Sequence, residues 1–92
     1  MVRLIDVKGL PDFKLQLKYN DGKQGIVDLS YITRDGIFDL WNKSGEFEKV
    51  YINHESNAPT WNDELDLDPF NLYLKLIGKT FEEYQKEKQA IA

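Results

Sequence analysis

The stretch "FKLQLKYNDGKQGIVDL", residues 13–29, decides the fold that the sequence predicts. Apolar and polar residues alternate along its first half, as in a strand that is buried on one face and solvated on the other. The Asp21-Gly22 pair that follows can take the positive φ angles of a tight hairpin turn. We therefore predict two antiparallel neighbouring strands, at 13–19 and 24–29.

Further segments extend this pattern. Residues 2–8, 50–52 and 58–61 have the composition of short strands, and the apolar residues between 37 and 41 are spaced for one face of a helix. Together they predict an α+β fold, with an antiparallel β-sheet of four to five strands and two to three helices packed on one face.

The stretch "ELDLDPFNLY", residues 64–73, places carboxylates at alternate positions with leucines between them. This alternation predicts a short strand with one acidic face. Pro69 follows Asp68, which is the arrangement of an acidic helix N-cap with proline at the first helical position. We predict that Asp68 and Pro69 begin a helix through the apolar residues 70–77.

Residues 78–92 are predicted to be a helical or frayed C-terminal extension of a single α+β domain at 1–77. Thr80 and Glu83 have the spacing of a capping box. The apolar residues on one face of this helix are Phe81, Tyr84 and Ile91. Because most of its other residues are charged or polar, the helix depends on docking for its stability, and docking and fraying are open alternatives.

The composition excludes several classes of protein. With 92 residues, 41% of them hydrophobic, the chain fits one globular domain rather than a disordered segment. It has no cysteine, which rules out disulfides and thiolate chemistry. It has no apolar run of roughly 18 residues and no signal-peptide pattern, so we expect a cytoplasmic protein with no membrane association. Its net charge of −4 argues against direct nucleic-acid binding, which requires a basic surface.

The acidic residues before the capped helix are the main candidates for chemistry. Asp63, Glu64, Asp66 and Asp68 could offer oxygen ligands to Ca²⁺ or Mg²⁺, but the stretch lacks the glycine turn and the downstream glutamate of a calcium-binding loop. His54, the only histidine, lies in a polar turn, where we do not expect the adjacent Glu55 and Ser56 to face it as the orienting partner that a general base needs. The sequence therefore predicts no catalytic residue, no metal site and no cofactor.

Aromatic residues are more numerous than a small core requires. The chain has five Phe, five Tyr and two Trp. Tyr and Trp can keep a polar end in water, and they are enriched in binding hot spots. The candidate interaction surface consists of Tyr31, Trp41, Tyr51 and Trp61, for which burial in the core is the alternative.

Five motifs, in their order along the chain, resemble the family called domain of unknown function 2442. They are "YNDG" at 19–22, "VDLS" at 27–30, "GIFDLW" at 36–41, "FEKVYI" at 47–52 and "W…LDLDP…LY" within 61–73. The resemblance covers roughly residues 2–76. It implies a bacterial α+β domain that stands alone or is joined to a helix-turn-helix segment. It also implies, for some members, a small partner gene in an arrangement like that of toxin–antitoxin pairs.

The chain departs from this family in two respects. Asn62-Asp63-Glu64 stands where members often have glycine. Only about fifteen residues follow the similar region, so we expect no helix-turn-helix segment of the kind found in some members. The family has no established catalytic residues, so the resemblance implies none. We expect a non-enzymatic protein-interaction module, antitoxin-like or an accessory member of a pair, with a protein partner or as a homo-oligomer. The alternatives are a small metal-dependent enzyme that uses the acidic 63–68 segment, and a ligand-sensing or nucleic-acid-associated accessory domain.

The lack of a metal-binding pattern generates a prediction. Ca²⁺, Mg²⁺ and Mn²⁺ at millimolar concentration should leave the melting temperature unchanged. A specific site would instead stabilise the fold by about 2.7 kcal/mol at a roughly hundredfold excess over its dissociation constant. Thermal unfolding with and without each ion measures the effect, and a saturable rise in melting temperature would support the metal-dependent alternative.

Overall fold

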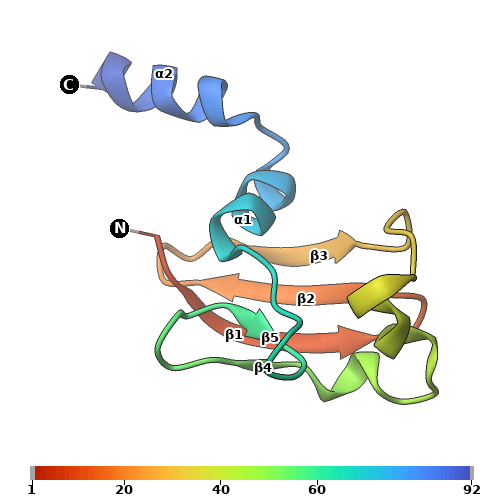
Figure 1. Ribbon diagram of the computed structural model, residues 1–92. Helices are drawn as coiled ribbons and strands as arrows, with labels where there is room; N and C mark the ends of the chain where they lie inside the picture. Colours follow the sequence, from red (N-terminus) through yellow and green to blue (C-terminus); the bar gives the residue numbers. More distant parts are fainter. Residues whose placement is uncertain (1, 92) are drawn as a thin grey trace.

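The predicted hairpin supplies two strands of a three-stranded antiparallel sheet with the order β1-β2-β3 (Figure 1). β1 spans Leu4–Leu10, β2 spans Lys14–Tyr19 and β3 spans Gln24–Asp28. The computed structural model describes the backbone of residues 2–91 and the side chains of residues 2–87.

The sheet has one apolar face and one solvated face. Leu15 on β2 lies opposite Gly9 on β1 and Val27 on β3, and these residues are buried. The neighbouring pair Gln16 and Ile26 points to the other face, where both side chains are exposed. The alternation read from the sequence therefore gives the correct inner and outer faces of the hairpin.

The chain after β3 covers the apolar face without adding strands to the sheet. Two 3₁₀ helices, η1 at Gly36–Asn42 and η2 at Phe47–Lys49, are followed by β4 at Tyr51–Ile52 and β5 at Pro59–Thr60. β4 and β5 pair with each other in a separate two-stranded sheet.

A single sheet of four to five strands is therefore not confirmed, although the α+β class is. β5 does not extend the main sheet because its first residue, Pro59, lacks the N–H that would continue a hydrogen-bonded ladder. The predicted strand before Asp68 also differs. Residues 65–67 pair only briefly with residues 59–61, through hydrogen bonds from Trp61 N–H to the Leu65 carbonyl and from Leu67 N–H to the Pro59 carbonyl.

An aromatic cluster joins this irregular half of the chain to the sheet. The Trp41 ring lies 4.9 Å from both the Phe47 and the Trp61 rings, measured between centroids. The Trp61 indole Nε1–H donates a buried hydrogen bond of 2.8 Å to the Phe47 carbonyl. Phe13 packs edge-on against Phe47 from the start of the hairpin. Such pairs contribute about 0.5–1.5 kcal/mol each beyond the burial of their surface.

Helix α1, Pro69–Ile77, lies over β3 (Figure 1). The Asp68 carboxylate accepts a 3.0 Å hydrogen bond from the Phe70 N–H, and Pro69 is the first helical residue. The helix can approach β3 closely because residue 25 is glycine. A Cβ at Gly25 would lie 2.8 Å from the Leu76 Cδ1 atom.

Helix α2, Phe81–Ile91, extends away from the sheet (Figure 1). Thr80 and Glu83 exchange the two hydrogen bonds of a capping box, at 3.0 and 3.1 Å. Tyr84 packs on Phe70 with ring centroids 5.3 Å apart, whereas Phe81 stays 55% exposed. The predicted contribution of the Ile91 side chain lies outside the described residues. Among the residues that the structure describes, no helix is long and apolar enough to cross a membrane.

The cap of α1 gives a second prediction. Asp68→Ala should lower the free energy of unfolding by about 0.5–2 kcal/mol, because the helix loses an acceptor and a favourable charge at its positive end. Asp66→Ala is the matched control, since this exposed acid makes no side-chain hydrogen bond to a described residue. Urea unfolding measures both variants, and equal stabilities would contradict the capping role.

Candidate interaction site

The acidic segment before α1 begins with a turn that is held by the side chain of Asn62. The Asn62 side-chain oxygen accepts hydrogen bonds from the N–H groups of Glu64 and Leu65, both at 2.8 Å. Asp63 and Asp66 are exposed, like Glu64. Among the described residues, no group of three or more His, Cys, Asp or Glu side chains is placed to hold a metal ion.

His54 lies in the exposed loop between β4 and β5. The Asn53 side chain shapes this loop by accepting hydrogen bonds from the N–H groups of Glu55 and Ser56, at 2.8 and 3.3 Å. Within the described part of the chain, no hydrogen bond orients the His54 imidazole.

The structure separates the four aromatic candidates into two pairs. Trp41 and Trp61 are 2% and 7% exposed and belong to the core. Tyr31 and Tyr51 are 62% and 47% exposed. The Tyr31 ring lies beside α1, with the Lys75 Nζ atom 4.5 Å from its centroid. Only the two tyrosines are available to a partner of the folded monomer.

Two buried tyrosines attach α1 to the hairpin. The Tyr73 hydroxyl donates a 2.6 Å hydrogen bond to the Asp21 carboxylate in the turn. The Tyr19 hydroxyl donates, also at 2.6 Å, to the carbonyl of Pro69 at the first turn of α1. The two rings meet edge-on with centroids 4.9 Å apart. These contacts fix where α1 crosses the sheet.

The same environment changes the acidity of these groups. Burial, followed by the hydrogen bond to Asp21, raises the pKa of Tyr73 to about 12. Burial and the nearby Asp68 charge raise the pKa of Tyr19. Desolvation opposes ionisation of Asp21, but the hydrogen bonds from Tyr73 and the Lys23 N–H outweigh it and lower the pKa of this carboxyl. The bond between Tyr73 and Asp21 is therefore made by a neutral phenol and a carboxylate.

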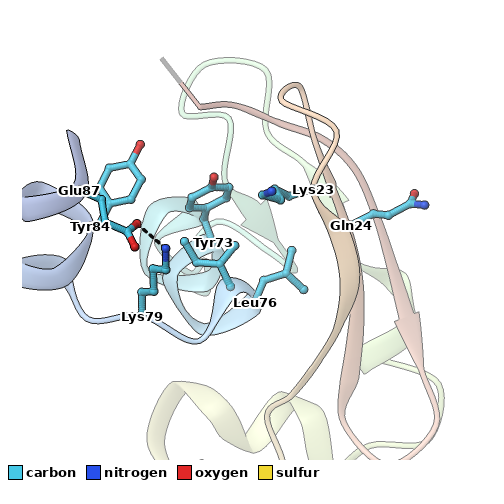
Figure 2. A pocket seen from close by; sticks show the side chains of 8 residues that line it. Lys23, Gln24, Tyr73, Leu76, Lys79, Tyr84 and Glu87 are labelled. Carbon is cyan, nitrogen blue, oxygen red and sulfur yellow. Dashed lines mark hydrogen bonds and ion pairs between the residues drawn. The ribbon is translucent and has the colours of Figure 1, made fainter. Parts of the chain in front are cut away.

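An open groove lies beside this attachment, between the start of β3, α1 and α2 (Figure 2). Its volume is about 510 Å³. We call it the α1–α2 groove. It is lined by Lys23, Gln24, Tyr73, Leu76, Ile77, Lys79, Tyr84 and Glu87.

The α1–α2 groove is apolar along α1 and charged at its end. Leu76 and Ile77 form the aliphatic wall. Lys79, in the linker after α1, forms an ion pair with Glu87 of α2 at one end of the groove (Figure 2). The Gln24 side chain points to the opposite face of β3, so its backbone borders the groove (Figure 2). The arrangement can receive an apolar side chain next to a strand edge.

Sequence reasoning did not identify this groove, although one signal pointed to it. The helix 69–77 carries apolar residues around more of its circumference than one packed face requires. Leu72 and Leu74 are buried, whereas Leu76 and Ile77 remain partly accessible. The excess of apolar residues predicts a second contact face. The position of that face follows only from the packing of α1 on β3.

Comparison with known protein families identifies the chain. Residues 4–78 match the family described as protein of unknown function DUF2442. The chain belongs to this family. The match confirms the resemblance seen in the motifs, and it covers the whole sheet and α1, whereas α2 lies outside the matched residues. Searches of curated proteins and of solved structures gave no match.

The Tyr73 contact predicts a pH-dependent stability. Because the pKa of Tyr73 is higher in the folded state than the ordinary value of about 10, its stabilising effect is complete below about pH 10 and is lost as the pH rises towards 12. Tyr73→Phe should lower the free energy of unfolding by about 1 kcal/mol at neutral pH. The difference from the parent protein should shrink or reverse near pH 11.

Urea unfolding at the two pH values measures this effect. Tyr51→Phe is the matched control, because it removes the hydroxyl of an exposed tyrosine. A difference between parent and Tyr73→Phe that stays constant from neutral to alkaline pH would show that the hydroxyl does not contribute through its protonation.

Proposed function

We propose that this chain is a non-enzymatic protein-interaction module whose partner docks in the α1–α2 groove. The observation that carries the proposal is the combination of an aliphatic wall, formed by Leu76 and Ile77, with the exposed backbone edge of β3 beside it. Apolar surface next to backbone donors and acceptors suits a polypeptide, which carries both kinds of group.

The shape of the groove favours a chain over a small molecule. Small-molecule sites enclose about 70–90% of the ligand surface. The α1–α2 groove is open to solvent, and its walls come from three separate elements, β3, α1 and α2. A partner segment lying along it would continue over neighbouring surface. Tyr31, on another flank of α1, is an exposed aromatic that a larger partner could also cover.

Charge supports a basic partner. The net charge of −4 attracts proteins of opposite sign and accelerates their encounter, an effect that weakens as salt increases. The family resemblance supports a specific form of this proposal. In this form the chain is the antitoxin-like or accessory component of a two-protein pair in a bacterial cytoplasm. The partner in that case is a small basic protein.

Affinity capture with matched variants tests the proposal. Lys23→Trp places an indole at the α1–α2 groove, and Lys23 is an exposed residue of the hairpin turn. Lys18→Trp makes the same exchange on the solvated face of β2. Tagged parent and variant proteins are incubated with extract of the native host, and the retained proteins are identified.

We expect one basic protein to be retained by the parent and by Lys18→Trp, with at least a tenfold loss of affinity for Lys23→Trp when the complex is reconstituted from pure components. Equal retention by both variants would move the binding surface away from the groove. Retention of no specific protein by the parent would contradict the proposed function.

A further inference from the structure

The hydrogen-bond register of the hairpin reveals which backbone groups of β3 are unused. The Tyr19 N–H donates to the Lys23 carbonyl at 2.9 Å, and the Leu29 N–H donates to the Phe13 carbonyl at 2.8 Å. In an antiparallel pair, residues directly opposite each other alternate between bonded and non-bonded pairs. The two observed bonds join residues 19 and 23 and residues 13 and 29. Counting in steps of two along each strand, the pairs Leu17–Gly25 and Leu15–Val27 are also hydrogen-bonded pairs.

This alternation gives the direction of the backbone N–H and carbonyl groups of every residue in β3. Gly25 and Val27 direct their N–H and carbonyl groups towards β2, where the sheet uses them. Gln24, Ile26 and Asp28 direct theirs away from β2. Within the described residues, β3 pairs with no strand other than β2. Three donors and three acceptors thus form an open edge.

The two edge strands of the sheet have different neighbours. β1 contacts η2 and β4, and a Cβ at Gly9 would meet the backbone of η2. β3 has α1 above its apolar face, and no strand formed by residues 2–91 lies at its outer edge. Natural edge strands are commonly protected by lysine, proline or a bulge. The β3 sequence, "QGIVD", has none of these, and Ile26 at its centre is 56% exposed.

The open edge and the α1–α2 groove are adjacent. Leu76 contacts β3 at Gly25, and the backbone of Gln24 borders the groove (Figure 2). A strand added to this edge would send alternate side chains to opposite faces. One set would enter the groove against Leu76 and Ile77, and the other would lie beside Ile26 on the solvated face.

We propose that the partner binds as an extended segment that adds a fourth strand to the edge of β3. This inference rests on the proposed function and specifies how the partner is recognised. Main-chain hydrogen bonds to Gln24, Ile26 and Asp28 hold the segment, and its apolar side chains at every second position fill the α1–α2 groove. Its flanking residues are basic, matching the net charge of −4.

A partner segment fits this edge better than a second copy of the chain. Antiparallel pairing of two β3 strands would bring two α1 helices to the same face, directly above the junction. A lone extended segment carries no helix with it, so it meets no such obstruction. Self-pairing is therefore an outcome that the test must distinguish.

The test uses random twelve-residue peptides, selected by display against the full chain, as the probe. Ile26→Pro removes one outward N–H and leaves the bonds to β2 intact, as proline is tolerated at such positions of an edge strand. Ile26→Val, which keeps the N–H, is the matched control. We expect the selected peptides to bind Ile26→Val like the parent and Ile26→Pro at least tenfold more weakly.

Amide hydrogen exchange on the parent protein gives a second measurement that needs no variant. Peptide binding should slow exchange at least tenfold at Gln24, Ile26 and Asp28. Gly25 and Val27, whose N–H groups already bond to β2, are the internal controls and should change much less. Bound peptide with no added protection at the three outward amides would overturn the proposal.

The remaining outcomes separate the two claims. Peptides that are lost with Lys23→Trp but bind Ile26→Pro like the parent would keep the groove as the binding site and overturn strand addition. Failure to enrich any peptide on the parent over Lys23→Trp would overturn both. A dimer in sedimentation that Ile26→Pro dissociates would replace the partner segment by a second copy.

Discussion

The structure depends on one constraint, which is that the three-stranded sheet has a single apolar face. Leu15, Leu17 and Tyr19 are fully buried along β2, and their polar neighbours leave the other face in water. A small sheet of this kind is stable only when something covers the apolar side. The 49 residues from 29 to 77 serve this purpose with two 3₁₀ helices, a two-stranded sheet and α1. The Trp61 indole, bonded to the Phe47 carbonyl, ties the irregular cover together.

The segments that cover the apolar face do not by themselves cover the backbone edges of the outer strands. The candidate site lies at one of these edges. The cover returns along β1, which contacts η2 and β4. At the other side, α1 crosses β3 through the contact of Leu76 with Gly25 and then ends at Gly78. The helix therefore shields the apolar face of β3 but not its backbone edge. The groove and the open edge both result from the way α1 packs on β3.

The chain has sixteen acids, and in its described part no three or more of the His, Cys, Asp and Glu side chains are grouped to hold a metal ion. Asp68 accepts from the first turn of α1, Asp21 accepts from Tyr73 and the Lys23 N–H, and Asp28 accepts from the Ser30 N–H. Each of these three carboxylates accepts a hydrogen bond from the N–H two residues further along the chain, at a turn or a helix start.

The sequence by itself determined the elements whose causes are local. The hairpin, the Asp68-Pro69 helix start and the Thr80–Glu83 capping box follow from alternation, turn residues and short-range hydrogen bonds. Tertiary structure decided the rest. It separated β4 and β5 from the main sheet, buried Trp41 and Trp61 while leaving Tyr31 and Tyr51 exposed, and placed α1 beside the open edge of β3. Local sequence could not specify these features, because each depends on which distant residues share the limited space over one apolar face.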